Sequence, residues 1–462
     1  MSFPRYQKYK DSGVQWLGDV PQHWTVGSIK YLGRLNPSKS EVTEDGASLC
    51  SFIPMEKLKT GEIALDENRP IEDVIGGYTY FRDGDVLFAK VTPCFENRNM
   101  AIAQGLTGGL GFGSSEINVL RPRNADVRFL YYRIQEHSLM KIWESEMSGA
   151  GGLKRVPTEI ITNFLVAAPD KEEQESISAF LDHETAKIDA LIAEQQRLIE
   201  LLKEKRQAVI SHAVTKGINP NAPMKDSGVE WLGEVPAHWE ITRIGWQCIV
   251  GNGCTPARDN PSYWNDGHYP WLNSSKVNLK RVIDADQFVT DKALRECALP
   301  IVKPGSVLMA ITGEGKTRGM VTIAEIEATI NQHVAFIQPR SKKLYPVYLH
   351  DWLNANYSRI RHDSADWGST KAAITCSDVR AYPLPLPPIE EQEAICHFIQ
   401  SKSSLINDLI SSSESSISLL QERRSALVSV AVTGIIDVRD WRSDTALSAS
   451  MPMASEEAAQ YS

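Results

Sequence analysis

Apolar residues recur at alternating spacings of three and four in two long segments of the chain, residues 169–216 and 387–436. In the first segment the spacing runs through Ile188, Leu191, Gln195, Leu198, Leu202, Lys205 and Val209. In the second, Ile406, Leu409 and Leu420 hold corresponding positions, while Ser413 and Ser416 interrupt the middle. Because this spacing is typical of a coiled-coil seam, the sequence predicts two long helices.

The predicted helices are too long to be buried inside one domain, since about 45 residues at 1.5 Å each give roughly 65 to 70 Å. We expect the two helices to pack against each other in antiparallel orientation, because each then supplies the seam that the other needs. The alternative is that each helix packs on its own domain, but the two seams would then need two separate partners.

The two regions that precede the helical segments, residues 25–165 and 240–385, have a mixed pattern. Short β-type runs at residues 85–89 and 306–310 are bounded by glycine and proline turns. The two runs are equivalent, but the residues that follow them differ completely. We therefore expect an α+β protein with two mixed α/β domains joined by two long antiparallel coiled-coil helices, arranged as a pseudo-two-fold internal repeat.

A short motif also occurs twice, which identifies the chain as a tandem duplication. Residues 10–24 read KDSGVQWLGDVPQHW and residues 225–239 read KDSGVEWLGEVPAHW. The segments that we expect are 1–24 with the first motif, 25–168 as the first mixed domain, 169–216 as the first long helix, 217–239 as a linker with the second motif, 240–386 as the second mixed domain, 387–436 as the second long helix, and 437–462 as a flexible tail.

Composition indicates a folded, cytoplasmic protein without a membrane partner. Hydrophobic residues make up 42% of the chain and charged residues 23%, which is typical of globular domains. The chain has no apolar run of membrane-spanning length and no secretory signal pattern. Its seven cysteines are scattered without a C-x-x-C pair, which favours reduced thiols over disulfides or a metal site.

The net charge of -9 does not exclude a nucleic-acid partner, because one positive face can exist on an acidic molecule. Arginine and asparagine can pair with guanine and adenine, and a lysine in a glycine-rich turn can approach a phosphate. The candidate DNA-binding residues are Lys90, Asn97, Arg98, Asn99, Lys154 and Arg155 in the first mixed domain, and Arg258, Lys276, Lys316, Thr317, Arg318 and Lys371 in the second.

Residues 310–317 match a relaxed form of the nucleotide-binding phosphate loop. The residues that follow Thr317 are rich in glycine and β-branched side chains, which oppose the helix that such a loop needs. A nucleotide-binding protein with a coiled-coil arm therefore stays an alternative. No metal-protease or nucleophile-elbow motif is present.

With these motifs in this order, the chain resembles the specificity subunit of type I restriction-modification systems. The resemblance rests on the motif at 10–24 and 225–239, on P-L-P-P-x-x-E-Q-x-A-I at 385–395 with a weaker counterpart at 167–177, and on the paired long helices. It covers nearly the whole chain. The looser match at 167–177 and the serines of the second seam are departures from the pattern.

The resemblance implies a DNA-binding subunit without catalytic activity of its own. Each mixed domain would be a target recognition domain that reads one half of a split double-stranded DNA site, and the helices would set the gap. The subunit would dock two adenine methyltransferase subunits and the restriction and translocase subunits. Cofactors would then be absent from this chain, with S-adenosylmethionine, ATP and magnesium on the partner subunits.

The repeated short motif is expected to serve the common frame or two equivalent partner contacts, because near-identical copies cannot read different half-sites. The residues that we assign to partner docking are Trp16, His23 and Trp24 in the first copy and Trp231, His238 and Trp239 in the second. A scaffold that binds proteins and no DNA is the remaining alternative.

Overall fold

The chain folds into two compact units. Unit 1 consists of Met1–Gln196 and Ser415–Ser462, and unit 2 consists of Arg197–Glu414. The computed structural model describes residues 3–149, 153–313, 315–364 and 373–442. Lys371 and most of the expected tail lie outside the described residues.

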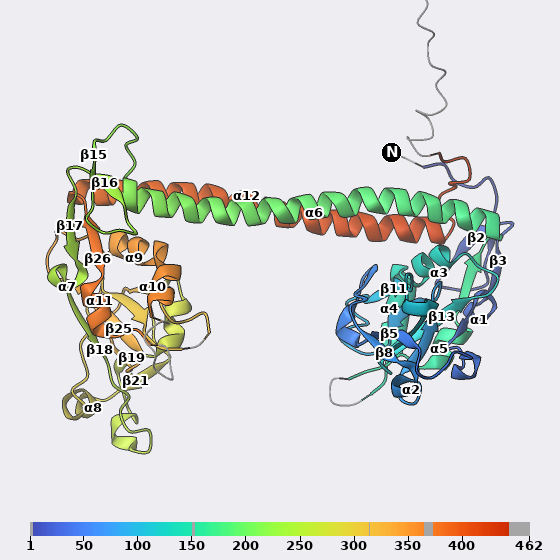
Figure 1. The fold of residues 1–462 in the computed structure, drawn as a ribbon, viewed down its shortest axis with the longest axis horizontal. Helices are drawn as coiled ribbons and strands as arrows, with labels where there is room; N and C mark the ends of the chain where they lie inside the picture. Colours follow the sequence, from blue (N-terminus) through green and yellow to red (C-terminus); the bar gives the residue numbers. More distant parts are fainter. Residues whose placement is uncertain (1–2, 150–152, 314, 365–372, 443–462) are drawn as a thin grey trace, which may run out of the picture. The chain divides into compact units, whose positions relative to one another are not determined.

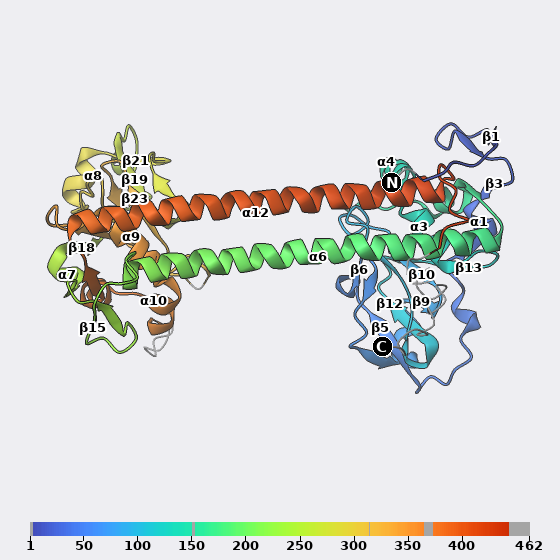
Figure 2. The same ribbon diagram turned by 90° about the horizontal axis from the view of Figure 1, so that it is seen from above.

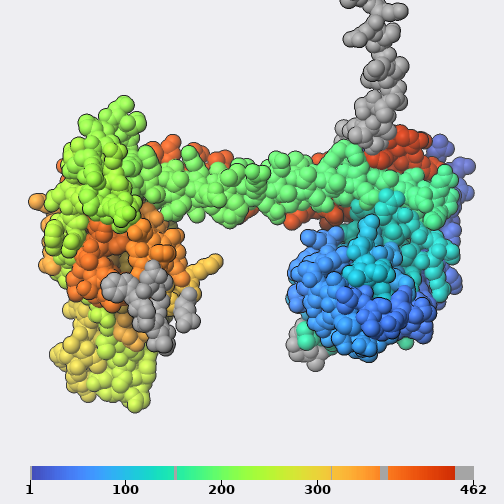
Figure 3. Space-filling view, in the orientation of Figure 1, coloured from blue at the N-terminus to red at the C-terminus, as the bar shows by residue number. Residues whose placement is uncertain are grey.

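Two four-stranded sheets form the mixed domain of unit 1. The first has the order β11 (Met100–Ile102), β10 (Val86–Ala89), β13 (Ile117–Pro122), β4 (Gly33–Leu35), and the second has the order β8 (Asn68–Pro70), β5 (Leu49–Ile53), β12 (Leu110–Gly113), β9 (Thr79–Arg82). All pairs are antiparallel except β5 with β12. In the space-filling view this domain is one closely packed body (Figure 3).

Beside the one-turn helices α1 (Ile29–Leu32) and α2 (Ile71–Val74), the domain of unit 1 has three longer helices: α3 (Val127–Ile134), α4 (His137–Ser145) and α5 (Thr158–Asn163). Their apolar residues join one core with Phe88 and Leu120 of the first sheet. Strand β3 (Thr25–Ser28) pairs antiparallel with β14 (Leu165–Ala168), so that the domain begins and ends at the same place.

The domain of unit 2 repeats this plan with different edges. Its main sheet has the order β18 (Cys248–Asn252), β25 (Val334–Pro339), β22 (Val307–Ala310), β23 (Val321–Ala324), β20 (Arg281–Val282), and a smaller sheet has the order β21 (Gln287–Val289), β19 (Tyr269–Leu272), β24 (Thr329–Ile330). The helices are α7 (Ile244–Gln247), α8 (Asp291–Glu296), α9 (Pro346–Ala355), α10 (Tyr357–Asp363) and α11 (Cys376–Ala381). Strand β17 (Glu240–Arg243) pairs with β26 (Pro383–Leu386).

The predicted β-type runs are the equivalent strands β10 and β22. Each is fully buried and pairs antiparallel with the longest strand of its sheet, β13 or β25. The residues after Thr317 form strand β23 and not a helix. The loop at 310–317 therefore lacks the helix N-terminus on which a phosphate loop depends, and the alternative of a nucleotide-binding protein loses its support.

The two long helices are α6 (Lys171–Lys216) and α12 (Ile389–Val432), and each passes from one unit into the other. Within unit 1, Arg424 of α12 donates to Asp189 of α6 at 2.9 Å. Within unit 2, Arg206 of α6 donates to Asn407 of α12 at 2.7 Å. In each unit the helices run side by side in opposite directions (Figures 1 and 2). The predicted fold class, including the antiparallel helix pair, is confirmed.

The predicted register of the seam is wrong at several positions. Leu191, Leu198 and Leu409 are 51%, 41% and 47% exposed, while the neighbouring Ile199 is only 7% exposed. The seam follows Ile188, Ile192, Gln195, Ile199, Leu202 and Arg206 in α6, and Ile406, Ile410, Ser413, Ile417, Leu420 and Arg424 in α12. Adjacent leucine and isoleucine pairs are equally apolar, so spacing alone did not decide between the two registers.

None of the helices in the described ranges combines the length and the apolar character that crossing a bilayer requires.

Candidate nucleic-acid interface

The first copy of the repeated motif forms a hairpin that binds the start of α6. Strands β1 (Tyr9–Asp11) and β2 (Asp19–Pro21) pair antiparallel, and His23 and Trp24 follow directly. His23 Nε2 lies 2.7 Å from Glu173 of the first turn, and Trp24 Nε1 donates to the same carboxylate at 2.9 Å. Tyr6 donates its hydroxyl to Glu173 at 2.6 Å. Three donors thus surround one carboxylate near the positive end of the helix.

The second copy, with strands β15 (Met224–Asp226) and β16 (Glu234–Pro236), binds the start of α12 in the same way. His238 Nε2 lies 2.7 Å from Glu391, the equivalent of Glu173. Trp239 is fully buried, and its Nε1 has no partner among the described residues.

Each hairpin also contacts the end of the other long helix. Gly434, with φ +76°, follows α12, and a Cβ there would lie 2.5 Å from Pro21 and 3.2 Å from Trp24. Gly217, with φ +75°, follows α6 and lies against Trp239. Glycine serves at both ends because it adopts the left-handed conformation and leaves room for the hairpin.

These contacts give the repeated motif a structural role within the chain. Trp24 and Trp239 have no exposed surface. Trp16 packs on Phe164 with ring centroids 5.0 Å apart, and Trp231 stacks on Trp352 at 6.0 Å. Of the six candidates for partner docking, Trp16 and Trp231 are partly buried, and His23 and His238 are half-exposed and each contact a glutamate.

The end of β10 in unit 1 carries a cluster of charged side chains. Lys90 follows β10, and its backbone N–H donates to the carbonyl of Glu116, just before β13. Val91 forms a β-bridge with Arg155. Arg155 donates from Nε and Nη2 to the two oxygens of Glu116, both at 2.8 Å. We call Lys90, Glu116, Lys154 and Arg155 the first polar cluster; it contains three cations and one carboxylate.

The Arg155 guanidinium lowers the pKa of Glu116 below its ordinary value. The hydrogen bond from Arg155 is the largest contribution, and it outweighs partial burial of the carboxyl group. Glu116 is therefore ionised at neutral pH, and the bidentate pair fixes the orientation of the guanidinium.

The end of β22 in unit 2 has the same backbone arrangement with different side chains. The N–H of Ile311 donates to the carbonyl of His333, as Lys90 does to Glu116. Thr312 forms a β-bridge with Ala373, as Val91 does with Arg155. Ile311, His333 and Ala373 therefore stand where unit 1 has Lys90, Glu116 and Arg155.

A chain of hydrogen bonds joins the polar side chains at this place in unit 2. Thr312 Oγ1 lies 2.8 Å from His333 Nδ1, and His333 Nε2 lies 3.1 Å from the amide nitrogen of Gln332. Thr255 donates its hydroxyl to the amide oxygen of Gln332 at 2.5 Å. We call Thr255, Thr312, Gln332 and His333 the second polar cluster. It carries no permanent charge, so the two units present different chemistry at one position of a shared frame.

Within the described residues, the other candidates of unit 1 form no side-chain hydrogen bond with the first polar cluster. Arg98 contacts His137 at 3.2 Å and Ser425 of α12 at 3.4 Å, so its cation faces the helix. Asn97 is exposed, and its carbonyl accepts a hydrogen bond from Thr60. Asn99 is half-buried; its backbone N–H donates to the carbonyl of Cys94, and its carbonyl accepts from the N–H of Ala89.

Among the candidates of unit 2, Lys276 and Arg318 are buried, with 8% and 5% exposure. Lys276 is bound by Asp284 at 3.1 Å and Asp286 at 2.9 Å, so its charge is neutralised within the domain. Arg258 is exposed and stacks on Trp264 at 3.8 Å. Lys316 is exposed and Thr317 is half-buried in the loop after β22.

Sequence reasoning missed Glu116, Thr312, Gln332 and His333. A signal was present, because polar residues stand directly before the apolar strands β13 and β25 in both halves. Only the pairing of β10 with β13 and of β22 with β25 brings these residues to the ends of the central strands.

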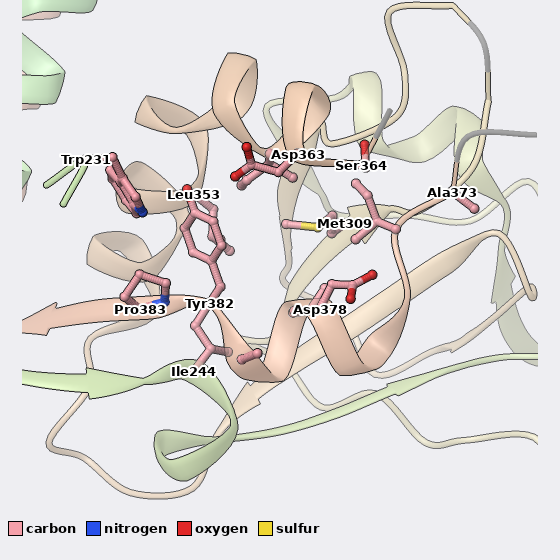
Figure 4. Close-up of a pocket in the computed structure, with 14 residues that line it drawn as sticks. Trp231, Ile244, Met309, Leu353, Asp363, Ser364, Ala373, Asp378, Tyr382 and Pro383 are labelled. Atoms are coloured by element: carbon pink, nitrogen blue, oxygen red, sulfur yellow. The ribbon is translucent and has the colours of Figure 1, made fainter. Parts of the chain in front are cut away.

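Unit 2 also contains a mainly apolar cavity of about 270 Å³ beside α10 and α11 (Figure 4). Trp231, Met309, Leu353 and Tyr382 line it, with Asp363 and Asp378 at its edge. Asp378 is engaged in the capping box of α11 with Thr375. No group of residues suited to hold a metal ion occurs in the described part of the chain.

Several known proteins and one family model are similar to this chain. A family model described as the type I restriction modification DNA specificity domain matches residues 236–418. The EcoEI specificity subunit of Escherichia coli is 36% identical over 163 residues, which is 34% of this chain and 27% of that protein. The EcoAI subunit of the same organism is 35% identical over 190 residues, which is 40% of this chain and 31% of that protein. The chain thus matches less than a third of these two relatives.

A longer match is the putative MjaX specificity subunit of Methanocaldococcus jannaschii, 22% identical over 94% of this chain and 99% of that protein. The crystal structure of the HsdS subunit from Thermoanaerobacter tengcongensis has a TM-score of 0.52 and 18% identity, covering 90% of this chain and 98% of that one.

A chain from a study of type I R-M complex assembly and conformational transition has a TM-score of 0.69 and 17% identity, covering 89% and 98%. These two structures support the fold. Residues 236–418 thus match the type I restriction modification DNA specificity domain, and the first half of the chain repeats the same structural frame.

Proposed function

We propose that this chain is the sequence-specific DNA-binding subunit of a type I restriction-modification enzyme. Each mixed domain reads one half of a bipartite double-stranded site, and the long helices set the gap between the halves. One observation carries this proposal: the two polar clusters occupy equivalent places in a duplicated frame but differ in every side chain. A protein whose two similar domains bind two different DNA sequences needs a shared backbone frame with different side chains at the binding positions.

The charge of the clusters supports a DNA partner. Lys90, Lys154 and Arg155 are cations on an otherwise acidic chain, and cations bind phosphates with release of counterions. Guanidinium, amide, hydroxyl and imidazole groups at exposed strand ends are the groups that read base edges in the major groove.

Exchange of one domain tests the two-reader proposal. Replacement of residues 25–168 by the corresponding region of another family member should change one half of the selected site and leave the other half unchanged. Replacement of residues 240–386 should change only the other half. Both are measured by sequencing duplexes selected from a random library, or by methylome sequencing of cells that carry the full system. A change of both halves by either exchange would contradict the proposal.

The partners of the proposed enzyme are two methyltransferase subunits together with restriction and translocase subunits. Equivalent exposed leucines on the helices support two copies of one partner: Leu191 in unit 1 corresponds to Leu409 in unit 2, and Leu419 in unit 1 to Leu201 in unit 2. We propose that S-adenosylmethionine, ATP and magnesium bind to these partners, that this chain has no catalytic role, and that the complex acts in the cytoplasm.

Salt dependence separates this function from that of a scaffold that binds only proteins. The affinity of the complex for its selected duplex should fall steeply with salt concentration, and it should exceed the affinity for random duplex by about 10³-fold or more. Equal affinity for both duplexes at every salt concentration would favour the scaffold.

A further inference from the structure

The hydrogen bonds of the two polar clusters determine which atoms stay free to bind a base. In the first cluster, Arg155 uses Nε and Nη2 for Glu116. This side-on pairing leaves Nη1 and one N–H of Nη2, which together form a two-pronged donor edge that has no partner among the described residues. Arg155 and Glu116 keep 46% and 27% of their side-chain surface, so this edge is accessible.

The second cluster leaves a different edge. The oxygen of the Gln332 amide accepts from Thr255, and its nitrogen contacts His333. An amide oxygen has two lone pairs and the nitrogen has two hydrogens, so the Gln332 amide keeps one acceptor and one donor position without a partner among the described residues. Gln332 and His333 are both exposed.

We propose that the domain of unit 1 reads a guanine through Arg155, and that the domain of unit 2 reads an adenine through Gln332. This inference rests on the proposed DNA-binding function. Two N–H donors match the O6 and N7 acceptors of guanine, whereas one donor and one acceptor match N7 and the N6 amino group of adenine.

Glu116 is a positioning residue in this scheme, because it contacts the guanidinium and holds its free edge outward. Thr255 and His333 have the same role for the Gln332 amide. The domain of unit 2 cannot read guanine in the same way, because Ala373 stands at the position of Arg155 and its side chain has no hydrogen-bond donor.

Site selection with variants of the full chain, co-expressed with its own methyltransferase subunit, tests the assignment. Arg155→Ala should lower the preference for one G·C pair in one half-site by about 5- to 150-fold and leave the other half-site unchanged. Gln332→Ala should do the same for one A·T pair in the other half-site. Arg155→Lys keeps the charge, so it should keep the salt dependence and still lose the preference for guanine.

Glu116→Gln tests the positioning role. It should weaken the guanine preference while the melting temperature and the adenine preference stay unchanged, a pattern that mere loss of folding does not give. Arg69 is the matched control, since it also donates from Nε and Nη2 to a carboxylate, that of Glu67, in the same domain. Arg69→Ala should leave both half-sites unchanged.

Each outcome bears on a defined claim. If the wild-type complex selects a bipartite site but Arg155→Ala and Gln332→Ala select the same site, this inference is overturned and the proposed function stands. Loss of preference at a base pair other than G·C or A·T respectively also overturns it. If the wild-type complex selects no sequence at all, the proposed function itself fails.

Discussion

At the scale of single residues, one glutamate in the first turn of each long helix joins the repeated hairpin to that helix. Glu173 is 5% exposed and accepts from Tyr6, His23 and Trp24. Burial and the neighbouring carboxylate raise the pKa of Tyr6, so its hydroxyl stays protonated as a donor.

The equivalent glutamate of the second long helix, Glu391, is more exposed and is bound by His238, while the indole N–H of Trp239 has no partner among the described residues. The two copies of the motif are therefore alike in sequence but unequal in bonding.

This inequality predicts unequal costs of substitution. Glu173→Gln places an amide NH2 group against three donors, and we expect it to destabilise unit 1 by about 2 to 3 kcal/mol. Glu391→Gln disturbs one partly exposed contact and should cost about 1 kcal/mol. Scanning calorimetry of both variants measures the difference. Equal losses would mean that the additional donors to Glu173 contribute nothing.

At the scale of elements, the helix pair shows what a sequence pattern can and cannot determine. The alternating spacing of three and four is enough to predict α6, α12 and their antiparallel pairing. It does not settle the register, because Leu198 and Ile199 are both apolar and only packing reveals that Ile199 is buried. The seam also contains Arg206 and Arg424, which a search for apolar residues passes over although they make equivalent contacts in the two units.

The corrected seam predicts different effects for two adjacent residues. Ile199→Ala removes a buried side chain and should lower the stability of unit 2 by about 2 to 4 kcal/mol. Leu198→Ala removes an exposed one and should cost less than about 1 kcal/mol. Alanine is the best helix former, so helix propensity does not explain a loss in either variant. Thermal unfolding followed by circular dichroism measures both, and a larger loss for Leu198→Ala would restore the register that the sequence suggested.

At the scale of the whole molecule, duplication organises the chain. The boundaries between the units fall after Gln196 and Glu414, which are equivalent positions of the two helices. The sequence reveals this duplication because the short motifs and helices repeat. It does not reveal the second polar cluster, because Thr255, Thr312 and His333 are distant in the chain and meet only when β18, β22 and β25 join one sheet.

The equivalent boundaries also define a test of the helices as a spacer. Insertion of three heptads after Gln196 and after Glu414 preserves the seam and adds about 31 Å to each helix. One turn of DNA is about 34 Å, so the second half-site returns to nearly the same face of the duplex. We expect the gap of the selected site to grow by about nine or ten base pairs, with both half-sites unchanged.

Shorter insertions sharpen this test. One heptad adds about 10 Å, or three base pairs, and turns the second half-site by about 100° around the duplex, so affinity should fall. A five-residue insertion displaces the apolar seam by more than a quarter turn and should destabilise the helix pair itself. Site selection gives the gap for each variant, and circular dichroism reports the helices. An unchanged gap after three intact heptads would mean that helix length does not set the spacing.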